Sequence, residues 1–282
     1  MRGTAQFTLG MGIAVAAITM CYWHLRRSTY SLRRRLSRQE VSKFKQEGFL
    51  VVRNILALPE VEALTEDAME AWLTHKRPFD PADTWLNNSL LVNIHHYAKR
   101  VRDYYFEGPL LDIMEQLIGP NLKGATSQLT FKLKGNTMPF GWHQDNGYGE
   151  LDPYNAVSCL TALDDVDRDN GCLWVVPRSH KRGQLGSLSA EDKIKGAVIP
   201  PPSVDEAEAL PVSMGAGDVL LLHCHTLHMS GGNTSGRDRR VLFLRYADAD
   251  AVEVFNYRKP RLGRLVRGKT VFDEVASYER NL

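Results

Sequence analysis

Two histidines and one aspartate have the residue types and the spacing to hold a metal ion. His143 and Asp145 are separated by one residue in the segment GWHQD, so in an extended chain both side chains leave the same face. His228 lies farther along, directly after an apolar run that predicts another strand. Two imidazoles and one carboxylate on one face of an octahedral ion leave its other positions open. This ligand set is typical of non-haem Fe(II) oxygenases, in which a cosubstrate and dioxygen take the open positions.

Arg239 and Ser230 supply the groups that a dicarboxylate cosubstrate needs. Between His228 and Arg239 lies the turn-rich segment GGNTSG, so the flanking strands are expected to run antiparallel as a hairpin. In that geometry Arg239 returns beside Ser230, close to the metal. A guanidinium binds a carboxylate through two parallel hydrogen bonds. With the 2-oxo acid end on the iron and the far carboxylate on Arg239, the spacing indicates 2-oxoglutarate.

Several neighbouring residues compete for these roles. His223 and His225 share one face of the same predicted strand and are alternatives to His228 as the third ligand. The spacing to the serine and the arginine selects His228, and His225 is then expected to be a pocket residue or to support the ligands. On the last strand, Arg240 alternates to the opposite face, and Arg245 is expected to point outward or to form a salt bridge.

The elements that must position these residues are mostly strands. The segment SRQE at 37–40 predicts a capping box that begins a helix, which ends at Gly48. Apolar periodicity predicts two further helices, at 59–75 and 110–118. Strands are expected at 49–52, 129–133, 156–163, 172–176, 219–223 and 241–246. Helices followed by many short strands favour a mainly β fold, a double-stranded β-helix (jelly roll, cupin-like) with flanking α-helices.

Length and composition favour one catalytic domain. A chain of 282 residues can bury a sizeable core in such a domain and still have a terminal extension. The formal net charge of +2 gives no electrostatic case for nucleic acid, so the expected partner is a small-molecule substrate. The cysteines Cys21, Cys159, Cys172 and Cys224 have no metal-finger spacing. Three of them lie in apolar runs, which predicts buried free thiols in a reducing compartment.

The N-terminus carries an apolar segment at 7–25 without a charged residue. A helix of about 17–25 apolar residues can cross a bilayer, so membrane association through this segment is expected. Six arginines follow it before the first acidic residue, Glu40. The positive-inside rule then predicts a membrane anchor with the catalytic domain facing the cytosol, and a mitochondrial targeting segment is the alternative. The chain is accordingly divided into an anchor or targeting segment with an Arg-rich flank at 1–36 and a catalytic domain at 37–282.

A set of motifs in a fixed order resembles a known family. They are FKQEGFLV (44–51), WHQD (142–145), NGCLWVVPRSH (170–180), GDVLLLH (217–223) and the stretch from His228 through Ser230 to Arg239. Over residues 37–250 this order resembles the phytanoyl-CoA dioxygenase (PhyH-like) family of Fe(II)/2-oxoglutarate-dependent oxygenases. The motifs are specific for the family and say little about the substrate.

The resemblance implies roles for six residues. His143, Asp145 and His228 correspond to the iron ligands, and Arg239, Ser230 and Lys132 correspond to the residues that bind 2-oxoglutarate. Lys132 matches a family lysine on the strand before the metal motif. Lys134 is an alternative, because the family often has Pro-Gly where this chain has Lys134-Gly135.

The implied activity is that of an Fe(II)- and 2-oxoglutarate-dependent dioxygenase. With O2 it would hydroxylate, or otherwise oxidise, an unactivated C–H bond of a small substrate and release succinate and CO2, with ascorbate in support. The apolar N-terminus favours a lipophilic substrate. Two alternatives stay open: a cupin-type metalloenzyme that uses zinc or manganese without 2-oxoglutarate, and a non-catalytic, membrane-tethered binding module. Arg239 disfavours the first, and the intact ligand set disfavours the second.

Overall fold

The computed structural model describes residues 34–75, 88–186 and 204–282. In these ranges the helices are α2 (Arg38–Glu47), α3 (Leu58–His75), α5 (Lys99–Glu107), α6 (Leu110–Leu117) and α8 (Asp273–Ser277), with 3-10 helices η1 (Ile94–His96), η2 (Asp145–Tyr148), η3 (Ser179–Arg182), η4 (Glu206–Glu208) and η5 (Val254–Asn256). The strands are β1 (Phe49–Val52), β2 (Leu90–Val92), β3 (Leu122–Lys132), β4 (Phe140–His143), β5 (Leu151–Asp152), β6 (Val157–Ala162), β7 (Leu173–Val175), β8 (Leu210–Val212), β9 (Val219–His223), β10 (His228–Ser230), β11 (Arg239–Asp248), β12 (Val252–Glu253), β13 (Lys259–Pro260) and β14 (Leu265–Arg267).

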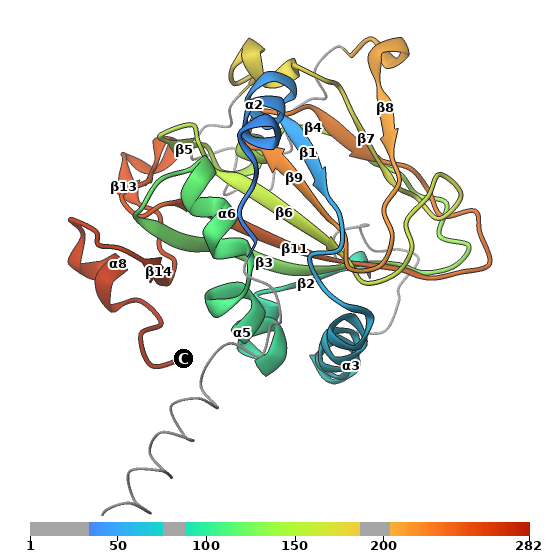
Figure 1. The fold of residues 1–282 in the computed structure, drawn as a ribbon, viewed down its shortest axis with the longest axis horizontal. Helices are drawn as coiled ribbons and strands as arrows, with labels where there is room; N and C mark the ends of the chain where they lie inside the picture. The colour runs from blue at the N-terminus through green and yellow to red at the C-terminus, as the bar shows by residue number, and fades with distance from the viewer. Residues whose placement is uncertain (1–33, 76–87, 187–203) are drawn as a thin grey trace, which may run out of the picture.

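Two antiparallel sheets form the body of the protein. The larger has seven strands in the order β1-β9-β6-β11-β3-β14, with β2 also paired to β3. The smaller has four strands in the order β4-β10-β7-β8, and Figure 1 shows β4, β7 and β8 gathered at one side of the molecule. Two facing sheets with helices on the outside are the architecture that the sequence predicts. The double-stranded β-helix with flanking α-helices is therefore confirmed.

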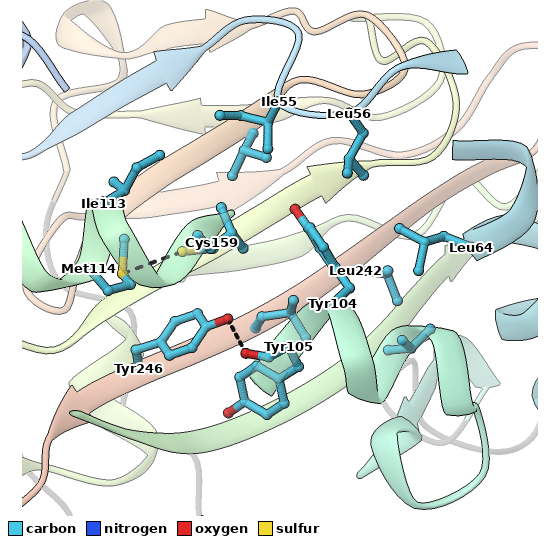
Figure 2. Packing of buried hydrophobic residues seen from close by; sticks show 14 of the residues in the cluster. Ile55, Leu56, Leu64, Tyr104, Tyr105, Ile113, Met114, Cys159, Leu242 and Tyr246 are labelled. Carbon is cyan, nitrogen blue, oxygen red and sulfur yellow. Dashed lines mark hydrogen bonds between the residues drawn. The ribbon is translucent and has the colours of Figure 1, made fainter. Parts of the chain in front are cut away.

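The larger sheet is covered on both faces, and strand alternation decides which layer each side chain joins. In β9, Leu221 packs in the cluster that includes the helices, whereas Leu220 and Leu222 pack in the cluster shared with the smaller sheet. Because both faces are buried, this strand is apolar from Val219 to Leu222 instead of alternating with polar residues. Figure 2 shows part of the helix-side layer, where Met114 of α6 lies against Cys159 of β6.

The helix α2 begins and ends as the sequence predicts. Glu40 N–H donates to Ser37 Oγ at 3.2 Å, and Ser37 N–H donates to Glu40 Oε2 at 2.8 Å, which completes the capping box. The helix ends at Gly48, where φ is +82° and a Cβ would lie 2.3 Å from His180 Nδ1. Glycine therefore permits the close approach in which Thr226 Oγ1 donates to Gly48 O at 2.6 Å. This bond ties the start of β1 to the loop that leads into β10.

The structure lengthens two predicted elements and adds two helices, α5 and α8. β3 begins at Leu122 instead of 129, and β11 extends from Arg239 to Asp248, so the two strands pair along most of their length. The longer of these two helices is α5, whose sequence KRVRDYYFE is strongly charged and has no side-chain hydrogen bond at its N-cap. Burial of its aromatic residues against the larger sheet stabilises it, and that burial is not visible from local sequence.

The predicted hairpin between the strands that carry His228 and Arg239 is wrong. β10 pairs with β4 and β7 in the smaller sheet, whereas β11 pairs with β3 and β6 in the larger one. The segment between them crosses between the sheets, where the N–H groups of Thr234 and Ser235 donate to Asp169 O at 2.8 and 3.0 Å. Because β11 already has a neighbour on each edge, no edge remains for β10. Arg239 therefore approaches the metal motif from the other sheet.

The predicted membrane-anchored localisation is wrong. Within the three described ranges, no helix is long and apolar enough to cross a bilayer. The segment 7–25, on which the anchor and the mitochondrial alternative rest, lies outside the described residues. The division of the chain into 1–36 and 37–282 stays a prediction.

The cysteines behave as predicted where the structure describes them. Cys159, Cys172 and Cys224 are buried free thiols, and Cys21 lies outside the described residues. Burial raises the pKa of Cys224 to about 12, so this thiol stays protonated at neutral pH.

Candidate metal centre and cosubstrate site

The structure brings the three predicted iron ligands together. β4 and β10 pair antiparallel with His143 opposite His228, and Asp145 begins η2 just after β4. The Nε2 atoms of His143 and His228 lie 3.8 and 3.6 Å from Asp145 Oδ1. One donor atom from each of the three residues lies within 4.8 Å of the others. Small side-chain movements would let all three share one ion.

Both imidazoles present a lone pair to this cluster. His143 Nδ1 lies 2.8 Å from Gly141 O, and His228 Nδ1 lies 3.0 Å from Thr226 O. A carbonyl oxygen only accepts, so each Nδ1 carries the hydrogen and each Nε2 is left with its lone pair. Burial, and then the nearby His228, lower the pKa of His143 to about 3, so this ring is neutral at physiological pH. Two nitrogen lone pairs facing a carboxylate fit a divalent cation such as Fe(II).

Asp145 is held by residues that the sequence analysis did not identify. Ser158 of β6 donates from Oγ to Asp145 Oδ2 at 2.5 Å. The guanidinium of Arg245 donates to the side-chain oxygen of Asn146, the next residue along. Burial raises the pKa of Asp145, but the two histidines, Arg245 and the Ser158 hydrogen bond lower it by more, and the net shift is downward. The carboxylate is therefore ionised and oriented before any ion binds.

The prediction that Arg245 points outward or forms a salt bridge is wrong. Arg245 is 7% exposed and lies opposite Ser158 in the pairing of β11 with β6. Its Nε has no hydrogen-bond partner in the described part of the chain. Arg239 and Arg245 are an even number of residues apart on one strand, so both face inward. That even spacing is the signal in the sequence that could have placed Arg245 near the metal.

Ser158→Ala is expected to weaken Fe(II) binding by about 10–100-fold, the usual cost of removing a group that supports a metal ligand. Without the hydroxyl, Asp145 Oδ2 loses its donor at 2.5 Å and the carboxylate can rotate. Anaerobic equilibrium dialysis measures the change. Thr161→Val is the matched control, because Thr161 lies on the helix side of the same strand and bonds to Tyr104. An equal loss in both variants would contradict a specific role for Ser158.

Arg239 and Lys132 form a buried pair of positively charged side chains. They lie opposite each other in the pairing of β11 with β3 and are 1% and 0% exposed. Arg239 donates to Gly171 O at 3.0 Å, and its Nε has no hydrogen-bond partner among the described residues. Lys132 donates to Ser230 O at 3.3 Å and to Gly231 O, which joins it to the end of β10. A buried guanidinium is costly without an anionic partner, so this pair fits a carboxylate ligand.

The neighbouring candidates are separated by their exposure. Lys134 is exposed, so the geometry favours Lys132. Arg240 lies on the other face of β11, where its Nε donates to Asp164 Oδ2 at 2.8 Å. Ser230 is 7% exposed, and the contact of its hydroxyl with 2-oxoglutarate stays a prediction.

His223 and His225, the alternatives to His228, lie beside the triad and outside it. Asn146 Nδ2 donates to His225 Nε2 at 3.3 Å, and Gln144 Nε2 donates to His225 O at 2.7 Å. The N–H of His225 donates to His223 Nδ1 at 3.2 Å. His225 thus supports the residues that flank Asp145, which is the role expected of it.

A cleft opens beside the first histidine. It is lined by Trp142, His143, Gln144, Gly147, Tyr148, Gln184, Leu185 and Gly186. Gln144 fixes one wall, because its Oε1 accepts the N–H of Leu185 at 2.8 Å. The ring of Tyr148 stands edge-on to His143 with 5.3 Å between centroids. Burial, and then Asp145, raise the pKa of Tyr148 to about 12, so its phenol stays protonated and can donate to a bound molecule.

A double-stranded β-helix with two histidines and a carboxylate clustered inside it is the architecture of cupin-type metal oxygenases. The family model for phytanoyl-CoA dioxygenase (PhyH) matches residues 44–241. The chain belongs to this family, and the resemblance found in its sequence is confirmed.

Individual relatives agree with this family in sequence, and a solved structure agrees in fold. Phytanoyl-CoA dioxygenase 1 of Oryza sativa subsp. japonica is 32% identical over 119 residues, which are 42% of this chain and 41% of that protein. The peroxisomal phytanoyl-CoA dioxygenase of Bos taurus is 25% identical over 270 residues, which are 87% of this chain and 77% of that protein. The crystal structure of the non-heme alpha ketoglutarate dependent carbocyclase SnoK from nogalamycin biosynthesis superposes with a TM-score of 0.67 at 23% identity, and covers 83% of this chain and 94% of its own.

These relatives differ in how much of their length is matched. The matched part of the chain spans 41% of the rice protein and 77% of the bovine one. The family's name is that of a dioxygenase, which agrees with the predicted class of enzyme.

Proposed function

We propose that this chain is an Fe(II)- and 2-oxoglutarate-dependent dioxygenase that oxidises a C–H bond of a small molecule. Within residues 37–282, His143, Asp145 and His228 hold the iron, while Arg239, Lys132 and Ser230 hold 2-oxoglutarate. One observation carries the proposal: three converging donor atoms are joined through β10 to a buried pair of positive charges. The triad alone would also fit zinc or manganese. The buried charges add the need for an anionic cosubstrate.

When bound, the iron supplies the reduction of dioxygen that couples decarboxylation of 2-oxoglutarate, to succinate and CO2, with oxidation of the substrate. The residues of the chain orient the partners. Gly141 O and Thr226 O fix the two imidazole rings, and Ser158 fixes the carboxylate of Asp145. Arg239 and Lys132 bind the far carboxylate where burial excludes water and strengthens charged hydrogen bonds.

The proposed substrate is a small molecule that enters through the cleft at Trp142 and Tyr148. These side chains offer apolar surface together with a phenol donor, which suits a molecule with a polar group near the oxidised carbon. The preference for a lipophilic substrate loses its support, because it rests on the membrane anchor.

Succinate release tests the proposal. The purified full chain, supplied with Fe(II), ascorbate and 2-oxoglutarate in air, is expected to form succinate slowly even without its substrate. Asp145→Ala should form none, because the cluster loses its carboxylate. A protein that binds Fe(II) and 2-oxoglutarate and forms no succinate with any of a panel of acyl-CoA esters, osmolytes and natural products would refute it.

Binding of 2-oxoglutarate is expected to weaken as pH rises above 7. Burial, and then the charge of Arg239, lower the pKa of Lys132 to about 7. Below pH 7 the ammonium is present and the affinity for the dianion is constant. Above pH 7 the free protein loses this proton, so the Kd rises by up to about tenfold per pH unit until the pKa of the complex is reached.

Anaerobic calorimetry at saturating Fe(II), from pH 6 to 9, measures this slope. Lys132→Met should bind more weakly at pH 6 and show a flat profile. Lys134→Met is the matched control, since Lys134 is exposed, and it should keep the slope. A slope that persists in Lys132→Met would assign the titration to another group.

A further inference from the structure

A second cluster of metal-binding side chains lies apart from the proposed iron site. His95 and His96 belong to η1, and Glu279 follows α8 near the C-terminus. One donor atom from each of these residues lies within 4.8 Å of the others. Figure 1 shows α8 at the opposite side of the molecule from β7 and β8, so this cluster is separate from the His143 cleft.

The carboxylate of Glu279 faces both imidazoles. Its Oε1 lies 2.7 Å from His96 Nε2, and its Oε2 lies 3.2 Å from His95 Nε2. The two rings stand edge to face with 4.3 Å between their centroids, so their Nε2 atoms converge. The side chains of His95, Glu279 and His96 are 7%, 14% and 33% exposed. Three donors are thus held in a partly enclosed position.

Ser127 orients the ring of His95 through the ring nitrogen that does not face Glu279. His95 Nδ1 lies 2.6 Å from Ser127 Oγ, which also accepts the backbone N–H of His95 at 3.3 Å. When Nδ1 donates to this oxygen, Nε2 turns a lone pair toward Glu279, and a cation between them is then stabilising. A metal ion between them gives both His95 Nε2 and the Glu279 carboxylate a bonding partner.

A cavity of about 620 Å³ opens beside the cluster. Its walls come from β3 and from the C-terminal segment 259–279, and they include the polar side chains of Thr126, Arg261 and Tyr278. An ion held by the three donors would therefore have protein on one side and this cavity on the other. That leaves space for a water molecule or a small ligand at a remaining coordination position.

We propose that His95, His96 and Glu279 bind a divalent transition-metal ion of the zinc type, with one coordination position open to this cavity. Two histidines, one glutamate and an open position are a known zinc donor set. Bonds of about 2.0–2.2 Å hold neighbouring donors of a tetrahedral ion roughly 3.4 Å apart. The 3.2 Å separation at His95 is close to that value, and the partly exposed His96 has room to adjust. The ion would join the C-terminal segment to η1.

The competing arrangement is metal-free. In it, Ser127 donates to His95 Nδ1, and both imidazoles donate to the Glu279 carboxylate. Both arrangements hold the C-terminus against the core, but only the metal-bound one makes zinc binding, and a rise of the Tm on adding zinc, depend on these residues.

Zinc stoichiometry separates the two arrangements. The full chain with His143→Ala and Asp145→Ala, which lacks the proposed iron site, is dialysed against Zn(II) and analysed for bound metal. One equivalent at this site and a higher Tm with zinc are expected. Adding Glu279→Gln should remove that equivalent and the Tm shift. Adding Glu274→Gln, which changes an exposed carboxylate of α8, should leave both unchanged.

A second variant keeps the test valid if Glu279→Gln unfolds. His96→Gln retains a hydrogen-bond donor for Glu279 and removes one ligand, so it should lose the zinc equivalent and keep the zinc-free Tm. Equal zinc binding in the Glu279→Gln and Glu274→Gln proteins would overturn the proposal. So would a folded triad-deficient protein that binds no zinc, which would leave the metal-free arrangement.

Discussion

His228→Ala is expected to lose its bound iron and to lower succinate formation at least ~100-fold, since removing a group that only supports a metal ligand already costs about 10–100-fold. His228 Nε2 lies 3.6 Å from Asp145 Oδ1 and is one of two nitrogen donors in the cluster. Without it, the ion keeps one imidazole and one carboxylate. Elemental analysis after anaerobic dialysis, together with the succinate assay, measures both losses.

His225→Ala is the matched control. His225 is also buried and lies three residues away, but its Nε2 accepts from Asn146 and lies outside the triad. This variant should retain one equivalent of iron, with a turnover reduced by less than about tenfold. Iron retained by His228→Ala and lost by His225→Ala would show that the third ligand has been chosen wrongly.

The metal cluster could be predicted because its signals are local. One residue separates His143 from Asp145, and this spacing places both side chains on one side of the chain wherever the segment runs. The cluster in the structure needs only one long-range pairing, that of β4 with β10. The same local rules predicted the capping box and five strands of the larger sheet (β1, β3, β6, β9 and β11), whose apolar runs require burial on both faces.

The surroundings of the cluster could not be predicted, because they depend on which strands become neighbours. Nothing local states that β11 pairs with β3, more than a hundred residues earlier, and that β10 therefore belongs to the other sheet. The hairpin was the simplest topology for a short polar connection, and it was wrong. Ser158 likewise meets Asp145 only because the two sheets face each other: β6 belongs to the larger sheet, and Asp145 follows β4 of the smaller one.

The membrane-anchored localisation rested on hydropathy alone. Hydropathy measures whether a segment can partition into a bilayer, and the segment 7–25 meets that criterion. Hydropathy does not by itself place the protein in a membrane. The described residues contain no such helix, so the membrane localisation has no structural support.

Arg239→Met is expected to raise the Kd for 2-oxoglutarate by about 30- to several-thousand-fold while leaving iron binding intact. Truncating one partner of a buried, hydrogen-bonded charge pair costs about 2–5 kcal/mol. Arg239 is 1% exposed, and burial lowers its pKa to about 10, so it remains charged at neutral pH. Lys132 stays in place in this variant and retains part of the attraction. Anaerobic calorimetry gives the Kd, and elemental analysis gives the iron content.

The thermal stability of Arg239→Met gives a second test. It is expected not to fall in the absence of 2-oxoglutarate, although the affinity for 2-oxoglutarate falls. Without 2-oxoglutarate, Arg239→Met should melt at the wild-type temperature or above it, because the change removes a buried charge that lacks an ion-pair partner among the described residues. Cosubstrate at 100 times the wild-type Kd should stabilise the wild type by about 2.7 kcal/mol and the variant by about 0.9 kcal/mol or less. Arg240→Met is the control, because Arg240 pairs with Asp164 on the opposite face and should keep the full response. If Arg240→Met lost that response and Arg239→Met kept it, the cosubstrate would bind elsewhere, because the two side chains share a strand and differ in the face they occupy.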